Sequence, residues 1–451
     1  MENTIKINVL IITYDFHPNS TVASFRSLSW LKYFKEFGID PIILTHSKNF
    51  KKQDSNFSKD SIYEDHCGKV VYFHLENSFI DKHENSKNLF IVLLRKLFSF
   101  FSILFQFNIR FNQYNSFMKK GSEILDSTNI DLILVTGGPF PLFKVANYLS
   151  SKYKIPWICD FRDTWSLSKS RNRNMLFKII NKYQESKAIN SASDITTVSD
   201  YLKQIFEKEW KKEVHTIRNG FNDWNFTDKV FHVQSNSQAG TIRIVYSGTI
   251  YPHHPIKEII STVIDLIEQG YDVNLDFIGI GVQHEQKIKS MLSYFKFEAK
   301  IKFIDRMPNE ELLLKIRSYD FALLFNEFNI SGTKIYEYLA LKIPILFCFL
   351  NVKYLENKDF IFKDQINSNI SNWPQVQMIE SSQSGILIKD EFDFQKVVKD
   401  YLIECNNLTK KFTFKGVEKY SRHEQVKLLS LIIKNRVALQ IKDNKSENSI
   451  F

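Results

Sequence analysis

Short runs of apolar, largely β-branched residues alternate along the chain with longer stretches of mixed polarity. The runs have the length and composition of strands buried in a parallel sheet, and the stretches between them have helical lengths. Strands that alternate with helices predict right-handed βαβ units and an α/β fold. The predicted strands cover residues 7–14, 41–45, 70–74, 131–136, 156–160, 194–198, 241–248, 273–279, 301–304, 321–325 and 343–347.

A stretch rich in Asn, Asp, Ser and Gln interrupts this pattern at residues 222–240. Because 451 residues are too many for one ordinary core, we interpret this stretch as a linker between two domains. The first Rossmann-like domain is expected over residues 1–225 and the second over residues 240–415. We expect the two domains to face each other across a cleft, with a ligand bound beyond the carboxyl ends of the strands.

Composition and charge narrow the class of partner. The chain is 43% hydrophobic and 24% charged, as in folded soluble proteins, and its net charge of +10 favours anionic partners such as nucleotide diphosphates, anionic lipids or nucleic acids. The cations are dispersed and no recognised nucleic-acid module occurs, so we expect no nucleic-acid partner. The four cysteines lack CxxC spacing, which argues against a zinc site or a disulfide framework. The N-terminus lacks the features of a signal peptide, and we expect a cytoplasmic protein.

Residues 88–107 form an apolar stretch long enough to span a bilayer. Arg95 and Lys96 lie near its middle, and further cations follow it, which disfavours spanning. Two alternatives stay open: a helix that lies in the membrane interface, or a core helix with its cations at the edge. The first predicts peripheral contact with the inner face of the plasma membrane through residues 88–120.

Residues 330–347 read as a loop, a short helix and a buried strand. Ser331, Gly332 and Thr333 suit a helix entrance, where backbone N–H groups without intrahelical partners favour a diphosphate. Lys334 adds a full positive charge there. Glu337 lies on the same helix face, where its carboxylate could accept hydrogen bonds from ribose hydroxyls. An ordinary amphipathic helix with a solvated Lys and Glu is the alternative.

Several motifs occur in order along this two-domain pattern. They are LIITYDFHP at 10–18, VTGGPF at 135–140, DFRDTW at 160–165, TTVS at 196–199, IRNGF at 217–221, VYSGT at 245–249, FIGIG at 277–281, KIYEYLA at 334–340 and SRHEQV at 421–426. The ordered set resembles the GT-B glycosyltransferases, specifically the retaining glycosyltransferase family 4, over most of the chain. The resemblance implies two Rossmann-like domains and a C-terminal helix, at residues 416–440, that crosses back to the first domain. The polar residues 441–451 are expected to fray.

The chain departs from the family pattern at two places. The family's donor signature is a pair of glutamates separated by seven residues, and here the second is Glu337 while the first position is Asn329. Either Glu327 substitutes for the missing carboxylate, or Asn329 contacts sugar hydroxyls as a neutral amide. The Gly-rich turn common after the first strand is also missing, and residues 19–23 replace it.

Transfer from a nucleotide-sugar requires stabilisation of a departing diphosphate, which cations and helix N-termini provide. Lys334 with the amides around it is the first candidate, and Gly248, where backbone can approach a phosphate, is the second. Arg306 could reach the base or a phosphate, or be an ordinary surface residue. The remaining donor-contact candidates are Thr249, Gly279, Gly281, Gly137 and Gly138, the last two beside the donor sugar.

A retaining transfer needs no protein base, because the leaving phosphate can accept the acceptor's proton. An inverting enzyme would need one, and His17 or Asp163 could serve. Asp160 and Arg162 could form a structural pair or contact substrate. His253 and His254 invite a metal site but lack an acidic partner at ligand spacing, so a phosphate contact or a plain turn is expected there. The GT-B resemblance implies that no metal-binding motif is needed, and on that basis we predict catalysis without a metal ion.

The sequence therefore predicts a glycosyltransferase that moves a sugar from a nucleotide-diphospho-sugar to a glycan or polyprenyl-linked acceptor, with retention, in cell-surface polysaccharide or lipopolysaccharide biosynthesis. Glu337, Lys334, Asn329 and Asp163 are the predicted catalytic residues, and no cofactor is expected beyond the donor substrate. A sugar-nucleotide epimerase and a non-catalytic partner of the same fold are the alternatives.

Overall fold

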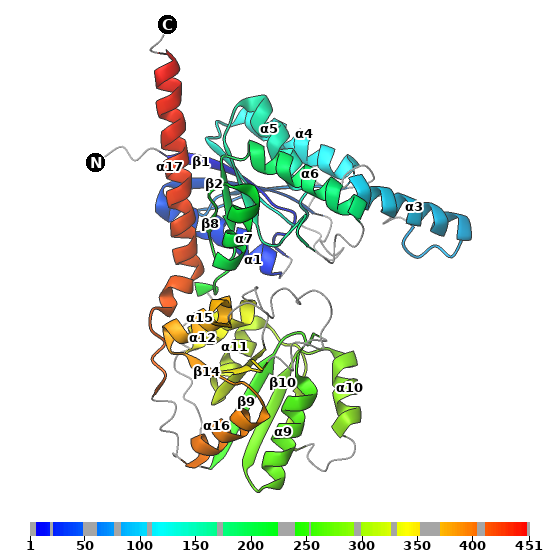
Figure 1. Cartoon of the computed structure of the whole chain (residues 1–451). Coiled ribbons are helices and arrows are strands. Elements are labelled where there is room, and N and C mark those ends of the chain that lie inside the picture. The colour runs from blue at the N-terminus through cyan, green and yellow to red at the C-terminus, as the bar shows by residue number, and fades with distance from the viewer. Residues whose placement is uncertain are drawn as a thin grey trace. The chain divides into compact units, whose positions relative to one another are not determined.

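Two β-sheets, each in a compact unit of its own, organise the computed structural model of the chain (Figure 1). The first unit comprises Met1–Asn219 and Arg422–Phe451, and the second comprises Gly220–Ser421. The structure describes residues 6–18, 21–47, 61–75, 83–105, 111–168, 175–223, 240–251, 254–292, 299–325, 332–351, 370–403 and 411–448.

The first sheet has the strand order β3-β4-β2-β1-β5-β6-β7-β8 and is parallel apart from the edge strand β3. Parallel pairing places Ile7 opposite Ile39 and Val9 opposite Leu132, so β1 lies at the centre, where the direction of winding changes. The strands are β1 (Ile7–Ile12), β2 (Ile39–His46), β3 (Ser61–Glu64), β4 (Lys69–Phe73), β5 (Leu132–Thr136), β6 (Trp157–Phe161), β7 (Asp194–Thr197) and β8 (His215–Thr216).

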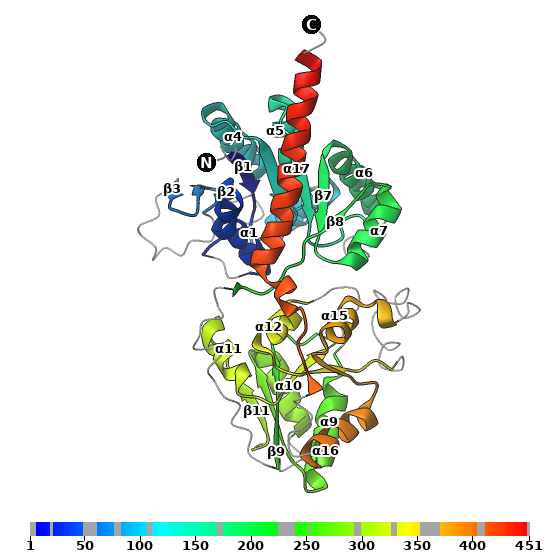
Figure 2. The same ribbon diagram turned by 90° about the vertical axis from the view of Figure 1, so that its left-hand side faces the viewer.

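Helices cover both faces of this sheet (Figure 2). One face packs against α4 (Phe111–Ser127), α5 (Leu142–Tyr153), α6 (Met175–Ser191) and α7 (Asp200–Trp210), and together they enclose one apolar core. The other face carries α1 (Val22–Tyr33) and the short helix η1 (Phe34–Phe37), which both contact α17 (Arg422–Asn448). The predicted C-terminal helix that returns to the first domain is confirmed, since α17 belongs to the first unit. It spans Arg422–Asn448 rather than residues 416–440, so the expectation that the chain frays from residue 441 is wrong as far as Asn448.

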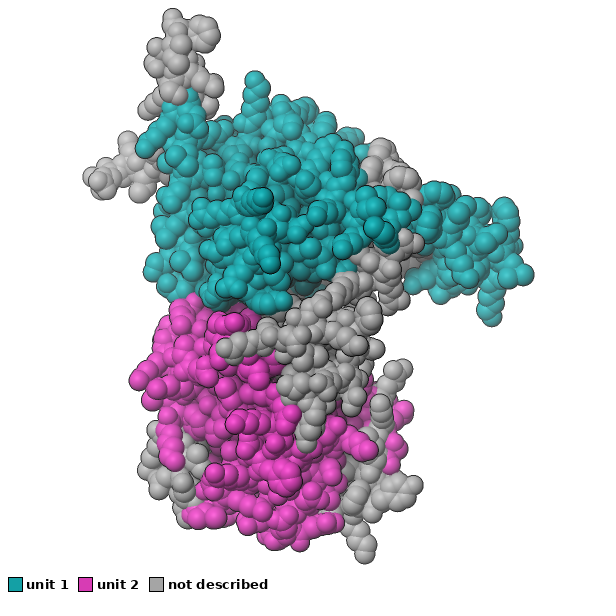
Figure 3. Space-filling view, viewed as in Figure 1, with its two compact units in different colours: residues 1–219, 422–451 teal, residues 220–421 magenta. Residues whose placement is uncertain are grey.

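Helix α3 (Leu89–Phe105) projects from the body of the first unit (Figure 3). None of the described side chains from Leu89 to Phe101 is buried, and Leu89, Phe90 and Leu93 are 85%, 68% and 65% exposed. The alternative of a core helix is therefore wrong for these residues, and the interfacial alternative stays a prediction. Among the residues that the structure describes, no helix has the length and apolarity that crossing a bilayer requires.

The second sheet is entirely parallel in the order β11-β10-β9-β12-β13-β14. This is the order of a doubly wound dinucleotide-binding sheet, and its switch point lies between β9 and β12. Its strands are β9 (Thr241–Ser247), β10 (Asp272–Ile278), β11 (Ile301–Ile304), β12 (Phe321–Phe325), β13 (Ile345–Cys348) and β14 (Gly385–Leu387).

Two apolar cores lie on the opposite faces of this second sheet. Helices α9 (Ile256–Glu268), α10 (Val282–Leu292) and α16 (Glu391–Ile403) enclose one core. Helices α11 (Asn309–Arg317), α12 (Thr333–Leu341) and α15 (Pro374–Ser382) enclose the other, with the short helices η3 (Ile370–Asn372) and η5 (Val417–Tyr420) nearby in the same unit. The α/β fold class predicted from the sequence is confirmed by these two sheets.

Candidate functional site

The loops that follow β9, β10 and β11 leave the second sheet side by side at its carboxyl edge. The backbone N–H of Gly248 donates to the carbonyl of Ile278 (3.0 Å), and the N–H of Gly279 donates to the carbonyl of Ile304 (2.9 Å). Arg306 follows on the third loop. In doubly wound sheets this edge, next to the switch point, is where ligands bind.

Lys334, in the first turn of α12, passes directly over Gly248. A Cβ atom added to Gly248 would lie 3.0 Å from Lys334 Cε, and Gly248 has a φ of +114°, which favours glycine. Two local features therefore require glycine at position 248: the positive φ of the backbone, and the lysine side chain that fills the space where a Cβ atom would lie. The sequence-based prediction placed both residues at a phosphate site, and the structure brings them into contact.

A buried tyrosine in the middle of α12 holds this helix against the end of β9. The Tyr338 hydroxyl lies 3.2 Å from Ser247 Oγ and accepts a hydrogen bond from the Ser247 N–H at 3.3 Å. Tyr338 lies four residues after Lys334 and therefore on the same side of the helix. Sequence reasoning did not select Tyr338 or Ser247, although this helical spacing is a signal that could have found the tyrosine.

Lys334 forms an ion pair with Glu337, with Lys334 Nζ 3.0 Å from Glu337 Oε2. The two side chains are 28% and 21% exposed, so the pair is accessible from solvent. Burial alone would lower the pKa of Lys334, but the Glu337 carboxylate outweighs it and raises the pKa above its usual value. The lysine is therefore charged at neutral pH, as binding a diphosphate requires.

The other predicted donor contacts that the structure describes lie on the loops after β9, β10 and β11 and at the start of α12. Arg306 is exposed, its Cα lies 3.7 Å from a Cβ built on Gly279, and its charge acts on Lys334 from the same sheet edge. Gly279 and Gly281 have φ values of +68° and +89°, and Thr249 is exposed. Gly332 is the N-cap of α12, and Thr333 is its first residue. Asn329, Ser331 and Glu327 lie outside the described residues.

In the first unit, Asp160 at the end of β6 pairs with Arg26 from α1. Arg26 Nη2 donates to Asp160 Oδ1 at 2.7 Å and Arg26 Nε donates to Oδ2 at 3.0 Å, while the Thr196 hydroxyl also donates to Oδ1 at 2.7 Å. Burial alone would raise the pKa of Asp160, but Arg26 and the hydroxyl donor lower it below its usual value. Asp160 therefore forms the structural pair with Arg26 rather than with Arg162.

Arg162 instead holds the loop after β5. Its Nε donates to the carbonyl of Gly137 at 2.9 Å and its Nη2 donates to the carbonyl of Gly138 at 3.2 Å. A Cβ on Gly138 would lie 2.3 Å from Arg162 Nη2, and one on Gly137 would lie 2.5 Å from Phe143. Both glycines are thus explained by packing within the unit, and their contact with a donor sugar stays a prediction.

The candidate bases of the first unit lie at the carboxyl edge of its sheet. His17 and Asp163 are both exposed. Asp15, which sequence reasoning did not select, is partly buried, and burial raises its pKa although Arg162 opposes the shift. The signal for Asp15 was its position just after the predicted strand at residues 7–14.

Among the described residues, no group of metal-capable side chains other than the one between β3 and β4 lies close enough together to hold an ion. His253 lies outside the described residues, and His254 is a buried turn residue whose Nδ1 accepts from the Tyr251 N–H at 3.3 Å. In the described part of the chain, the group that could hold an ion is Asp65, His66 and Cys67, consecutive residues in the turn between β3 and β4. The prediction of catalysis without a metal stays a prediction.

Comparison with known proteins supports the resemblance seen in the motifs. The Glycosyltransferase Family 4 model matches residues 28–224. Among solved structures, sucrose-phosphate synthase from Thermosynechococcus elongatus is 11% identical, with a TM-score of 0.60 over 96% of this chain and 100% of that chain. Anabaena HepE in complex with UDP is 10% identical, with a TM-score of 0.57 over 95% of this chain and 100% of that chain. UDP-GlcNAc 2-epimerase from Methanocaldococcus jannaschii is 14% identical, with a TM-score of 0.52 over 96% of this chain and 100% of that chain. No curated protein matches significantly. The family model supports the predicted resemblance to family 4 over residues 28–224, and the predicted GT-B fold is confirmed.

Proposed function

We propose that this GT-B chain is a glycosyltransferase that takes its sugar from a nucleotide-diphospho-sugar. The observation that carries the proposal is the position of Lys334, which crosses Gly248 at the entrance of α12 and pairs there with Glu337. A charged ammonium group, the backbone N–H groups of a helix start and the edge of a parallel sheet meet at one point. These are the groups that bind a diphosphate.

The same groups suit the chemistry of transfer. When the bond between the anomeric carbon and the diphosphate oxygen breaks, negative charge grows on the leaving group and positive charge grows on the sugar. Lys334 and the first amides of α12 stabilise the leaving group, and Arg306 supplies a second cation at the same edge. Glu337 orients Lys334 and accepts a hydrogen bond from a ribose hydroxyl, and Asn329 contacts the sugar as a neutral amide.

We further propose that transfer retains the anomeric configuration and needs no metal ion, as the family 4 resemblance implies. In such a transfer the acceptor hydroxyl loses its proton to the leaving phosphate on the same face of the sugar. The NMR resonance of the proton on the product's anomeric carbon distinguishes retention from inversion. If the product is inverted, a base is required, and Asp163, His17 and Asp15 are the residues to substitute.

The proposed acceptor is a glycan or a polyprenyl-linked lipid of cell-surface polysaccharide or lipopolysaccharide biosynthesis. The exposed apolar side chains of α3 support a peripheral contact with the inner face of the plasma membrane, since cations and apolar residues on one short helix suit the membrane interface. HepE, of the same fold, binds UDP, which supports a uridine nucleotide as the first donor to test.

The experiment is a two-step screen of UDP-, GDP- and dTDP-sugars. Calorimetry first identifies the nucleotide that binds, and transfer to polyprenyl-linked acceptors is then followed with the same radiolabelled donor, with and without EDTA. We expect binding of one nucleotide class, and transfer that EDTA leaves unchanged. If no nucleotide binds, or if Lys334→Met binds as tightly as the natural chain, the proposed site is wrong.

A sugar-nucleotide epimerase is the second candidate, because a UDP-GlcNAc 2-epimerase shares the fold over 96% of this chain. Conversion of the donor sugar in the absence of an acceptor distinguishes it from a transferase. A non-catalytic partner is the third candidate, because Asn329 replaces a carboxylate of the family signature. Nucleotide binding without conversion or transfer identifies that case.

A further inference from the structure

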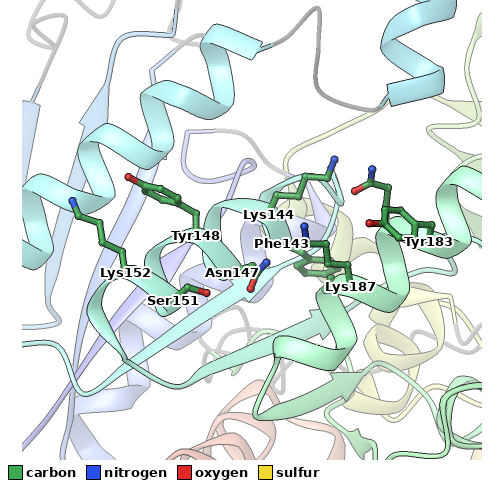
Figure 4. Close-up of a pocket in the computed structure, with 10 residues that line it drawn as sticks. Phe143, Lys144, Asn147, Tyr148, Ser151, Lys152, Tyr183 and Lys187 are labelled. Carbon is green, nitrogen blue, oxygen red and sulfur yellow. The ribbon is translucent and has the colours of Figure 1, made fainter.

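A cavity of about 640 Å³ lies between α5 and α6 of the first unit (Figure 4). Of the ten described residues that line it, three are lysines (Lys144, Lys152 and Lys187) and none is acidic. Lys144 and Lys187 approach the space from α5 and α6, and the Tyr183 hydroxyl lies beside them (Figure 4). Phe143 and Ala188 provide the apolar part of its wall. This lining suits an anion with an apolar portion.

The two lysines repel each other in this setting. Burial, and after it the positive charge of Lys187, together lower the pKa of Lys144 to about 7. An anion between the two ammonium groups removes that repulsion and favours the charged form of Lys144. The cavity is therefore electrostatically complementary to an anionic group and poorly suited to a cation.

One face of α6 connects the cavity to an apolar surface. Met175, Ile179, Tyr183 and Lys187 are spaced four residues apart, so they form one stripe along the helix. The first three are 77%, 57% and 65% exposed, and the stripe ends at the lysine that lines the cavity. A molecule with an anionic head in the cavity and an apolar tail along α6 would cover the stripe.

Helix α3 extends this apolar surface. It packs against α6, where the Phe100 and Phe177 rings have centroids 5.7 Å apart. Leu93, Leu97 and Phe101 of α3 are 65%, 50% and 40% exposed. Two helices in contact thus both carry exposed apolar side chains, and together they provide more apolar surface than isolated exposed residues do.

We propose that the cavity binds the phosphate group of an anionic membrane lipid, whose hydrocarbon lies along the apolar side chains of α6 and α3. Lys144 and Lys187 contact the phosphate, and the Tyr183 hydroxyl donates to it. The inference rests on the peripheral membrane contact proposed above and adds a defined head-group site to it. It is independent of the nucleotide site, which lies in the other unit.

The test measures sedimentation of the full chain with phosphatidylcholine vesicles, with and without phosphatidylglycerol. The variants are the pair Lys144→Gln/Lys187→Gln and a control pair, Lys178→Gln/Lys208→Gln, which replaces the same number of lysines at exposed positions outside the cavity. We expect the cavity pair to weaken binding to anionic vesicles about tenfold more than the control pair does. Thermal unfolding shows whether each variant is folded, and nucleotide binding should be the same in all.

Each other outcome overturns part of the inference. Equal losses in the two pairs would show diffuse attraction rather than a site. Inorganic phosphate that binds with the same sensitivity to the cavity pair, without a preference for anionic vesicles, would assign the cavity to free phosphate. If Leu93→Ser/Leu97→Ser abolishes vesicle binding while the cavity pair has no effect, the membrane contact stands and the head-group site is wrong. If the natural chain binds no vesicles, both are wrong.

Discussion

The carboxyl edges of the two sheets each hold a cation and a carboxylate, but the two pairs differ in their surroundings. Arg26 and Asp160 in the first unit are 2% and 0% exposed, and two hydrogen bonds join them. Lys334 and Glu337 in the second unit are 28% and 21% exposed and share a hydrogen bond of 3.0 Å. Lys334 and Glu337 lie beside the switch point between β9 and β12, whereas Asp160 lies on β6, one strand beyond the β1–β5 pair.

The difference distinguishes a structural pair from one that can bind a ligand. A fully buried charge cannot change its partner without a large desolvation cost, so Arg26 and Asp160 hold α1, β6 and β7 together. A partly exposed lysine can turn from Glu337 to a phosphate at little cost, because water already reaches it. We therefore expect the first pair to control stability and the second to control binding.

The largest expected effect is the loss of stability in Arg26→Met. The substitution leaves the buried Asp160 carboxylate without its guanidinium partner, and we expect the free energy of unfolding to fall by about 3–5 kcal/mol. Lys334→Met, at the partly exposed pair, should change it by less than about 1 kcal/mol. Urea unfolding followed by tryptophan fluorescence measures both.

A double variant sharpens this result. Arg26→Met/Asp160→Leu removes both charges, so we expect it to lose less stability than the sum of the two single changes. Strict additivity would show that the two residues act separately. If Arg26→Met and Lys334→Met lower the free energy of unfolding equally, the distinction between a structural pair and a ligand-binding pair is wrong.

Much of the fold follows from the chain's apolar periodicity. The strands at the centre of both sheets are continuous apolar runs, because both faces are covered by helices, and such runs are easy to identify. The strands missed were β3, β8 and β14, which have four, two and three residues, too few for a pattern to show. The polar stretch at residues 224–239 lies outside the described residues.

The candidate site was predictable where its residues are close in sequence. Lys334 and Glu337 are one helical turn apart, and a helix entrance is visible before them. The Arg26–Asp160 pair and the Ser247–Tyr338 contact join residues 134 and 91 positions apart, and only the folded sheet brings them together. The sequence consequently suggested Arg162 as a partner for Asp160, whereas the structure uses Arg26.

Glu185 is a second buried carboxyl group of the first unit, and unlike Asp160 it has no cationic hydrogen-bond donor among the contacts that the structure describes. Glu185 on α6 accepts hydrogen bonds from Ser166 rather than from a guanidinium group, and burial raises its pKa to about 7 although those bonds oppose the shift. Between the ordinary pKa of a glutamate and about 7, the folded chain holds more protons than the unfolded chain. Stability should therefore fall as pH rises through this window, by on the order of 3 kcal/mol.

Glu185→Gln removes the titrating group while keeping its shape, so we expect a smaller slope of unfolding free energy between pH 5 and 8. Asp160 behaves oppositely: its pKa is lowered, so its contribution is present at neutral pH and is lost in acid. Urea unfolding at a series of pH values measures both slopes. An unchanged slope in Glu185→Gln would mean that Glu185 is ionised in the folded chain.

The partly exposed pair of Lys334 and Glu337 should control nucleotide affinity. We expect Lys334→Met to weaken nucleotide binding by about 10- to 100-fold, the effect of one charged hydrogen bond, with little change in stability. Lys302→Met is the matched control, because Lys302 is an exposed lysine on β11 of the same sheet. Calorimetry with the nucleotide found in the donor screen gives both affinities, and equal losses would indicate a general charge effect.

The smallest effect distinguishes Lys334 from the backbone beneath it. Gly248→Ala and Gly270→Ala both place a side chain at a positive φ, +114° and +90°, and each should cost about 1 kcal/mol of stability. Only the methyl group on Gly248 meets Lys334 Cε, at 3.0 Å, whereas nothing lies within 4 Å of the position at Gly270. We expect Gly248→Ala to weaken nucleotide binding about fivefold and Gly270→Ala to leave it unchanged, because only the first displaces the ammonium group. Equal affinities in the two variants would show that the lysine adjusts freely, and the contact with Gly248 would then be incidental to binding.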